Sequence, residues 1–554
     1  MLSERKPLVE ENTIKPKKPT MDSNEEEIKA PTKSKDDNSI KKSKNSAAEE
    51  PPMSRSNSMA QVKLKSSHLN PKAAEKIKPI STSNAIQRKL TSLDSWKAAH
   101  GFSKDCKVFI INGEYPDIRA ALLERGWAEN TDVNSTFYDF LWSRKGKVPI
   151  LIKDWQVCNH FPKNQELVTK WRLCSNLKRL NAPKSGSSQF FPRCFKLKDE
   201  MNEFLEHYKI LRITGRVKQF LEKNDEFLME KLVLCIVILE RWIDFNRRNT
   251  GGEQMTLMSN VEWRNLISNT PFDVSSYLKE LKIDSLEETD KLMNLAKSCL
   301  ERLSEADPQF FINGTGKIWI VKPGGKSRGR DIAIFSELND IRNYVNNSEK
   351  WVIQKYIENP LLLDQRKFDI RQWVLISSSD PLIIWIYNEC YLRFSVEKYN
   401  AENLNNLFVH LTNNSISKNS EAFDGIEDGC MWHIDRFKEQ LFSIYGRDMW
   451  SEIFLKIKEI VKATILSVGN FGRRKSFEIL GYDFMIDENL KPWLIEINSS
   501  PAMDYSTPVT ELLVKQVLAD LVKVVVDRKD SPICDTGKFE ILYQGKVKLV
   551  GKIN

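Results

Sequence analysis

The segment Ile318–Ile332, which reads IWIVKPGGKSRGRDI, joins an apolar run to a strongly basic loop. Glycine lets a backbone approach an anion closely, while lysine and arginine supply the opposite charge. The segment therefore indicates an anion site, and a nucleotide phosphate is the anion that best explains it. Its spacing is neither GxxxxGK[ST] nor GxGxxG, so it supports neither a P-loop nor a Rossmann turn.

A second group of chemically active residue types lies near the C-terminus, in GYDFMIDENLKPWLIEIN. If ENLK connects two strands of a hairpin, Asp483 lies directly opposite Glu496, and Asn498 shares the face of Glu496. Two facing carboxylates repel each other unless a cation lies between them. Because carboxylate and amide oxygens suit Mg²⁺, with nucleotide phosphates completing its shell, we predict that Asp483, Glu496 and Asn498 hold Mg²⁺.

A third group begins in the strand-like segment KFDIR, which places Lys367, Asp369 and Arg371 on one face. Three polar side chains on one face of a strand indicate a polar cavity. Two later segments, YLRFS and HLTNNS, continue the polar lining: Arg393, Thr412 and Asn413.

These residues must be positioned by a mixture of strands and helices, which predicts an α/β (α+β) fold. Alternating or continuous apolar residues predict strands in KVFIING, KVPILIKDW, GKIWIVK, KWVIQKYI, FDIRQWVLI, PLIIWIY and the two segments that flank DENLK. Apolar residues at helical spacing predict helices in PDIRAALLERGW and over 200–219, 222–248 and 509–526. No internal repeat of 20–50 residues is visible in the sequence, which argues against a solenoid.

Composition divides the chain into segments. Residues before about 100 are rich in Lys, Glu, Ser, Pro and Asn and contain no aromatic residue until Trp96, so they cannot bury enough apolar surface to fold. We predict a disordered arm over 1–103, a small α/β domain over 104–185, a central domain with a helical insert and the phosphate-binding loop over 186–352, a catalytic domain over 353–528 and a tail over 529–554.

Charge and composition also limit the partners. The formal net charge of +9 over 554 residues favours an acidic partner. The nine cysteines are scattered without a CxxC pair, which suits a reducing compartment. The N-terminus lacks the apolar core of a signal peptide, and the longest apolar run, 232–239, is too short to cross a bilayer. We expect a cytoplasmic protein that binds neither a membrane nor nucleic acid, since the 14 tryptophans lie mostly within apolar strands and helices.

Together the motifs resemble those of ATP-grasp ligases and, in more detail, of the tubulin tyrosine ligase-like family. The resemblance runs from about residue 104 to 525 and rests on VKPGGKSRGRDI, QKYIENPLLL, KFDIRQWVL, YLRFS, HLTNNS, GYDFMID and WLIEINSSP. ALLERGW, NHFPKNQELVTKWRLCSNLKRL and SQFFPRCFKL are similar to upstream segments of its glycylase branch. The chain departs from the family at Asp331, where many family loops have glycine.

The resemblance implies a role for each motif residue. Lys322 would bind the α- and β-phosphates of ATP, and Arg328 and Gly329 would belong to a closing loop. The adenine hinge would be formed by Gln354, Lys355, Tyr356 and Ile357. The nucleotide would be faced by Lys367 and Asp369 and lined by Thr412 and Asn413. Substrate carboxylates would be gripped by Arg328, Arg371 and Arg393, and catalysis would depend on Lys322, Arg328, Arg371 and Glu496.

By the same resemblance, the chain is an ATP- and Mg²⁺-dependent ligase. It would join free glycine to the γ-carboxyl of glutamate residues in tubulin C-terminal tails through an acyl phosphate. A glutamylase of the same family and an inactive microtubule-binding pseudo-ligase are the alternatives. We expect a monomer that acts at the cytoskeleton, in a cilium or flagellar axoneme.

Overall fold

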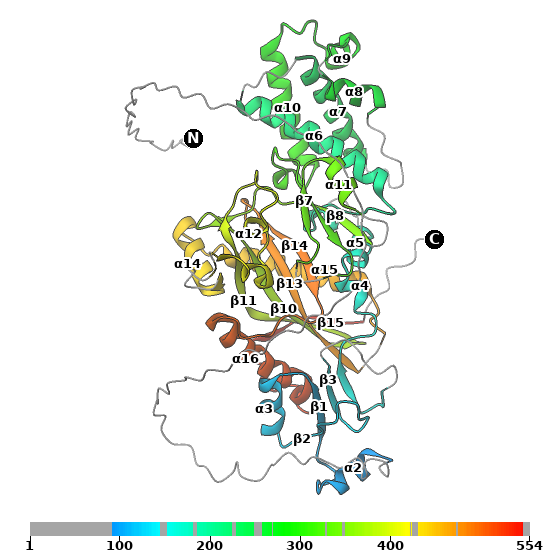
Figure 1. Ribbon diagram of the computed structural model, residues 1–554, viewed down its shortest axis with the longest axis vertical. Helices are drawn as coiled ribbons and strands as arrows, with labels where there is room; N and C mark the ends of the chain where they lie inside the picture. The colour runs from blue at the N-terminus through cyan, green and yellow to red at the C-terminus, as the bar shows by residue number, and fades with distance from the viewer. Residues whose placement is uncertain are drawn as a thin grey trace, which may run out of the picture. The chain divides into compact units, whose positions relative to one another are not determined.

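The computed structural model describes residues 91–143, 152–180, 186–223, 229–248, 258–268, 270–326, 329–345, 350–421, 423, 430–472 and 475–546. All of these residues belong to one compact unit, Thr82–Asn554. They form a mixed α/β protein with a large and a small sheet (Figure 1), as the sequence predicts.

The large sheet has a central path β12-β11-β10-β13-β4-β3-β1-β2, while β14, β15 and β9 pair with β13, β11 and β10. Its strands are β1 Val108–Asn112, β2 Ala128–Glu129, β3 Phe140–Ser143, β4 Val157–Asn159, β9 Leu362–Leu363, β10 Arg366–Ser379, β11 Leu382–Lys398, β12 Met431–His433, β13 Ser476–Ile486, β14 Pro492–Asn498 and β15 Phe539–Gly545. β13 is antiparallel to β10 and β14 but parallel to β4, so early and late parts of the chain share one sheet.

The small sheet is antiparallel, in the order β5-β8-β6-β7. Its strands are β5 Cys194–Lys196, β6 Trp319–Pro323, β7 Ala333–Phe335 and β8 Trp351–Lys355. The basic segment found in the sequence lies here, because β6 ends at Pro323 and the glycine-rich residues connect it to β7.

The helices surround these sheets, and α6 to α10 gather in one group at the end of the molecule drawn at the top of Figure 1. The helices are α2 Leu93–Ala99, α3 Pro116–Glu124, α4 Gln165–Val168, α5 Lys170–Lys178, α6 Met201–Lys223, α7 Met229–Arg248, α8 Asn260–Ile267, α9 Ser275–Leu281, α10 Thr289–Ala306, α11 Leu338–Tyr344, α12 Leu407–His410, α13 Asn414–Ser417, α14 Ile434–Tyr445, α15 Trp450–Val468, α16 Pro508–Val522 and α17 Arg528–Asp530. Within the described part of the chain, none is long and apolar enough to span a membrane.

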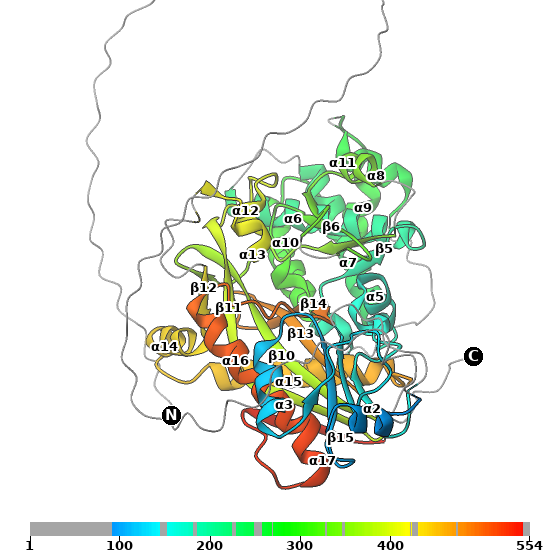
Figure 2. The same cartoon turned by 60° about the horizontal axis from the view of Figure 1, so that its bottom comes forward.

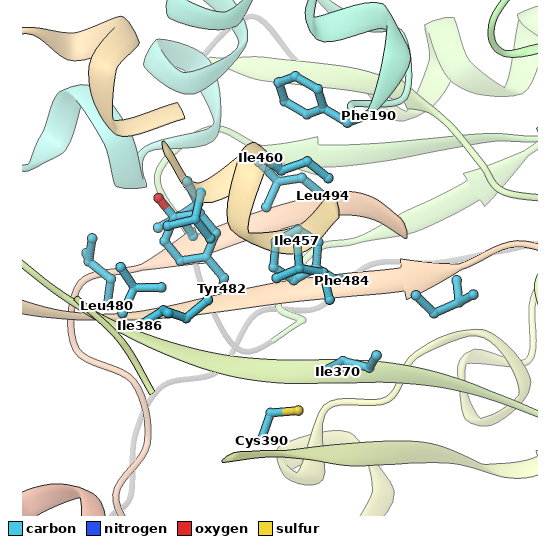
Figure 3. Close-up of a cluster of buried hydrophobic side chains, with 14 of the residues drawn as sticks. Phe190, Ile370, Ile386, Cys390, Ile457, Ile460, Leu480, Tyr482, Phe484 and Leu494 are labelled. Carbon is cyan, nitrogen blue, oxygen red and sulfur yellow. The ribbon is translucent and has the colours of Figure 1, made fainter. Parts of the chain in front are cut away.

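The large sheet has a hydrophobic core on each face. On one face, Tyr482 and Phe484 of β13 pack in a cluster with Ile457 and Ile460 of α15 (Figure 3). On the other face, Ile479 of the same strand packs with α16 and α3, which lie side by side in Figures 1 and 2. Because alternate side chains of β13 enter different cores, all eleven of its residues are buried, and the strand is a firm support for any polar side chain it carries.

Local signals explain where several of these helices begin and end. Thr507 caps α16 by accepting a hydrogen bond from the backbone N–H of Thr510, and Pro508 occupies the first helical position. At its other end, α14 stops at Gly446, whose φ of 68° is the left-handed conformation that glycine adopts readily at a helix C-terminus.

Three of the differences between the structure and the sequence predictions concern the two ends of the chain and the first sheet strands. Residues 1–90 of the predicted arm lie outside the described residues, but its last part forms α2, whose Trp96 packs against Val108. The described part of KVPILIKDW is not a strand, and the strand begins just after it, at Val157. The predicted tail contributes β15, which pairs with β11. The single tryptophan of α2 was too weak a signal to predict that helix from the sequence. The short run of alternating residues in β15 was likewise too weak to predict that strand.

Candidate active site

Twelve of the sixteen site residues predicted from the sequence line one cavity between the two sheets. They come from β6, the glycine-rich loop after it, β8 and the two residues that follow it, β10, β13, β14 and the α12–α13 segment: Lys322, Gly329, Gln354, Lys355, Tyr356, Ile357, Lys367, Asp369, Thr412, Asn413, Asp483 and Glu496. A second cavity shares Asn413 and Glu496 with it and is lined by Arg371, Arg393 and Asn498. Arg328 lies outside the described residues.

Lys322 is buried at the end of β6, where its Nζ donates a hydrogen bond to Oε1 of Gln354 on the neighbouring strand β8, at 2.7 Å. Burial lowers the pKa of Lys322 to about 8, although the carboxylate of Glu496 opposes that shift. A buried ammonium with one neutral partner is under-compensated, so this position favours an anion.

Lys367 lies on the other wall of the cavity, on β10. Its Nζ donates to the hydroxyl of Tyr356 and to the carbonyl of His410, both at 2.9 Å. Burial, reinforced by the ammonium of Lys322, lowers the pKa of Lys367 to about 7. The two lysines therefore raise the positive potential of one small volume, which suits a polyphosphate.

In the predicted adenine hinge, several polar groups already form hydrogen bonds and ion pairs within the protein. The buried ammonium of Lys355 contacts Glu358 and donates to the carbonyls of Ile318 and Tyr356 at 3.0 and 2.8 Å. The backbone amides of Lys355 and Tyr356 donate to the carbonyls of Arg193 and Ile318. These groups hold the segment in place, and an adenine edge would have to use the remaining backbone groups.

The hairpin near the C-terminus places Asp483 directly opposite Glu496, as predicted, but by a different route. The connection has five residues, 487–491, rather than the four predicted, and Ile486 pairs with Pro492. A β-bulge between the Phe484 and Asp483 pairings shifts the register by one residue and restores the facing carboxylates.

Asn498 completes this group of oxygen-bearing side chains. Its Nδ2 donates to Oδ2 of Asp483 at 3.2 Å and to Oε1 of Glu496 at 3.3 Å, so all three side chains converge. No cluster of three or more His, Cys, Asp or Glu side chains suited to a metal occurs among the residues that the structure describes. Two carboxylates and an amide nevertheless fit Mg²⁺, which binds proteins through one or two carboxylates when phosphates complete its shell.

Lys170, the first residue of α5, is a functional candidate that sequence reasoning missed. Its Nζ lies 3.0 Å from Oε2 of Glu496 and donates to the carbonyl of Lys326 in the glycine-rich loop at 3.1 Å. Burial alone would raise the pKa of Glu496, but the ammonium groups of Lys170 and Lys322 outweigh it and hold that pKa well below its ordinary value. One lysine on a short helix more than 300 residues before Glu496 gives no signal in the sequence that points to this contact.

The described part of the glycine-rich loop is held by two local features. Gly329 has φ of 71°, a conformation that glycine adopts readily, and a Cβ built on it would lie 2.3 Å from Cδ1 of Ile416, so a larger residue would also displace that side chain. The carboxylate of Asp331, the residue that departs from the family pattern, pairs with Lys326 at 2.7 Å within the loop.

Four charged side chains form a closed cluster across β10, β11 and β13. Arg371 Nε lies 2.7 Å from Oδ1 of Asp483, and Arg393 contacts both oxygens of Asp369 at 2.7 Å. Arg393 also reaches Oδ2 of Asp483 at 2.9 Å. Thr412 donates to Asp369 and ties the α12–α13 segment to the cluster.

A two-sheet α/β fold with a cationic cavity and a carboxylate pair between the sheets is that of an ATP-grasp-type protein. Comparison of sequences gives the family. The sequence pattern of the tubulin-tyrosine ligase family matches residues 253–534, and this chain belongs to that family.

Curated relatives are similar over most of the chain. Tubulin glycylase 3B from Tetrahymena thermophila is 36% identical over 550 residues, which cover 84% of this chain and 46% of the relative. Tubulin monoglycylase TTLL3 from Danio rerio is 30% identical over 534 residues, covering 80% of this chain and 69% of the relative. Protein monoglycylase TTLL8 from Mus musculus is 31% identical, covering 82% and 65%. The chain spans about half the length of the Tetrahymena relatives that it matches.

Proposed function

We propose that this protein is an ATP- and Mg²⁺-dependent ligase that joins glycine to the γ-carboxyl of glutamate residues in tubulin C-terminal tails. The observation that carries the proposal is the convergence of Lys170, Lys322, Asp483 and Glu496 on one cavity, next to a second cavity that holds Arg371 and Arg393. Relatives with matching sequence along most of the chain are named tubulin glycylases, which supports glycine as the amino acid.

The chemistry follows from the charges. A carboxylate is a poor electrophile, so it first takes the γ-phosphoryl group of ATP, which forms an acyl phosphate and releases ADP. The amine of glycine then attacks the acyl carbon, which forms the amide bond and releases inorganic phosphate and a proton. Lys322 and Lys170 offset the negative charge that develops on the transferring phosphoryl oxygens. Asp483, Glu496 and Asn498 would hold Mg²⁺, which supplies further charge compensation at the phosphates when bound.

The residues around this centre bind and orient the substrates. Lys367, Thr412 and Asn413 line the nucleotide, and residues 354–357 give it the adenine hinge. Arg371 and Arg393 hold substrate carboxylates in the second cavity, since a guanidinium binds a carboxylate through two parallel hydrogen bonds. Arg328 and Gly329 belong to the loop that closes over the phosphates.

The proposed partners are tubulin tails on microtubules and free glycine, and the proposed place of action is the cytoskeleton of a cilium or flagellum. Dense acidic tails suit a chain whose net charge is +9. The protein is proposed to act as a monomer.

Mass spectrometry of tubulin tails tests the proposal directly. Tubulin is incubated with the protein, ATP and Mg²⁺, and with glycine or glutamate in separate reactions. We expect added glycine residues on tail glutamates and none in the glutamate reaction. Glutamate addition would identify the enzyme as a glutamylase, and no ATP consumption with either amino acid would favour the inactive microtubule-binding alternative.

A further inference from the structure

The two arginines assigned to substrate carboxylates are already neutralised within the protein. Arg371, Arg393, Asp369 and Asp483 are all more than nine-tenths buried. Their mutual contacts lie between 2.7 and 3.3 Å, and the four formal charges sum to zero. A substrate carboxylate that entered this cluster unchanged would add an uncompensated negative charge to a buried site, which is costly.

Asp483 is the member that links this cluster to the carboxylate pair. Along the backbone it stands directly opposite Arg371 on β10 and directly opposite Glu496 on β14. Both oxygens of Asp369 are bound by Arg393, and both oxygens of Asp483 are bound by Arg371. Asp483 also accepts a hydrogen bond from Asn498, and the facing Glu496 is paired with Lys170. Asp483 therefore has two competing uses, as a partner for the guanidiniums and as a ligand for a cation.

We infer that Asp483 makes binding of the acidic acceptor depend on prior binding of Mg²⁺ and nucleotide, an inference that rests on the function proposed above. With the cation bound, Asp483 turns its charge toward the metal, and Arg371 is left without a full counter-charge. The acceptor carboxylate of the tubulin tail then takes the place of Asp483 beside Arg371. In the free protein Asp483 occupies Arg371 and so excludes the acceptor carboxylate. Binding of Mg²⁺ and nucleotide frees Arg371 for the acceptor.

The strands allow this exchange without a large movement. β10 and β13 pair without irregularity from Ile370 to Ile376, and both are buried, so their backbones are fixed. Only the Asp483 carboxylate has to redistribute its contacts among groups already within hydrogen-bonding distance.

Binding of a labelled peptide to the unmodified protein gives the first test. The full chain is titrated against a fluorescein-labelled tubulin C-terminal tail peptide, and fluorescence anisotropy is recorded for the protein alone, with Mg²⁺, and with Mg²⁺ and a non-hydrolysable ATP analogue. We expect affinity about tenfold higher with both ligands, since one charge-assisted hydrogen bond is worth about that factor. Equal affinity in all three conditions overturns the inference.

Two matched substitutions separate the roles of the two facing carboxylates. Asp483→Asn removes the counter-charge of Arg371, so the peptide should bind tightly and independently of nucleotide. Glu496→Gln removes the partner of Lys170 but leaves Arg371 paired, so the peptide should bind weakly in every condition. If Asp483→Asn binds the nucleotide-free peptide no better than Glu496→Gln does, the inference is wrong.

Further measurements distinguish a failure of the inference about Asp483 from a failure of the proposed ligase activity. Circular dichroism of each variant checks that it folds, and the wild-type titration needs no variant. Nucleotide-independent peptide binding by a protein that adds glycine to tubulin would overturn the inference alone. A peptide that binds only with Mg²⁺ and nucleotide, in a protein that adds no amino acid to tubulin, would support the inference and count against the ligase activity.

Discussion

At the scale of single residues, the site is defined by buried charges whose partners come from distant parts of the chain. Glu496 is the clearest case, because Lys170 and Lys322 keep it ionised although it is partly buried. An ionised carboxylate at this position can serve as a ligand for a cation, whereas a neutral carboxyl would bind one poorly. The identity of this one residue should therefore matter more for activity than for folding.

Replacement of Glu496 by Gln tests this point. Gln keeps the shape of the side chain but removes its charge, so we expect glycine incorporation to fall about 100- to 1000-fold, while the circular dichroism spectrum is unchanged. Glu488→Gln, an exposed position in the same hairpin, is the control and should keep full activity. Unchanged activity of Glu496→Gln would remove Glu496 from the proposed metal site.

The pKa of Lys367 gives a second prediction at this scale. Because burial lowers that pKa to about 7, Lys367 loses its proton as the pH rises from 6.5 to 9, and Lys322, with a pKa of about 8, follows. His410, next to Lys367, stays neutral in this range because burial lowers its pKa to about 4. Nucleotide affinity should therefore fall by about tenfold over this range as positive charge is lost.

Titration of a fluorescent ATP analogue at a series of pH values measures this dependence. Lys367→Arg is the matched variant, since a guanidinium stays charged throughout the range and should remove the fall in affinity near pH 7 while leaving the fall near pH 8 that Lys322 causes. An affinity that stays constant or rises with pH in the wild-type protein would contradict the prediction.

At the scale of elements, the hairpin β13–β14 is organised by its connection. Asp487 is buried there, and its carboxylate accepts hydrogen bonds from the backbone amides of Asn489 and Lys491 and from Nε1 of Trp493, at 2.8 to 3.0 Å. These bonds set the turn that leads into β14, which carries Glu496 and Asn498. The geometry of the carboxylate pair thus depends on a side chain outside the cavity.

Asp487→Ala should lower the free energy of unfolding by about 3 kcal/mol, because it leaves one buried and two partly buried donors without an acceptor. Urea denaturation followed by tryptophan fluorescence measures the change. Asn489→Ala, an exposed position in the same connection, should change stability by less than about 0.5 kcal/mol. A similar small effect of Asp487→Ala would show that the turn forms without these bonds.

Elements also show what the sequence could and could not predict. The facing of Asp483 and Glu496 follows from strand alternation and the turn residues, which are local, and it was predicted correctly although the loop length was not. The β-bulge of β14, in which Ile495 is the extra residue between Leu494 and Glu496, has no local signal in the sequence. It depends on how β14 packs against the neighbouring elements. The contact of Lys170 with Glu496 was missed for the same reason, since it joins elements whose proximity only the complete fold decides.

At the scale of the whole molecule, strands from the N-terminal part of the chain extend a sheet whose central strands come from its C-terminal part. β4 pairs with β13 in parallel, and a buried network ties the two together. Glu478 accepts a hydrogen bond from the backbone amide of Phe161 at 2.7 Å and lies 2.6 Å from Nδ1 of His160. The other ring nitrogen of His160 lies 2.9 Å from the carbonyl of Ser143. Nε2 also lies 3.2 Å from the amide nitrogen of Asn159, which is a donor, but the shorter contacts of the two ring nitrogens are both to acceptors. The charged imidazolium is the form that donates to both acceptors.

This network predicts how stability depends on pH. Burial opposes the charged form of His160, but the hydrogen bond and charge of Glu478 prevail and raise its pKa above the ordinary value. A raised pKa means that the stabilisation is fully present below about pH 6.5, the pKa of an unfolded histidine, and is lost as the pH rises through the folded pKa. Glu478→Gln should therefore cost about 3–5 kcal/mol at pH 6 and less at higher pH, where the imidazole of the wild-type protein is already neutral. Thermal unfolding of both proteins from pH 6 to 9, with the exposed α16 variant Glu511→Gln as the control, measures the difference. A cost that is already small at pH 6 and does not change up to pH 9 would mean that His160 is neutral in the folded protein, and that the N-terminal strands are held to β13 by neutral hydrogen bonds rather than by an ion pair.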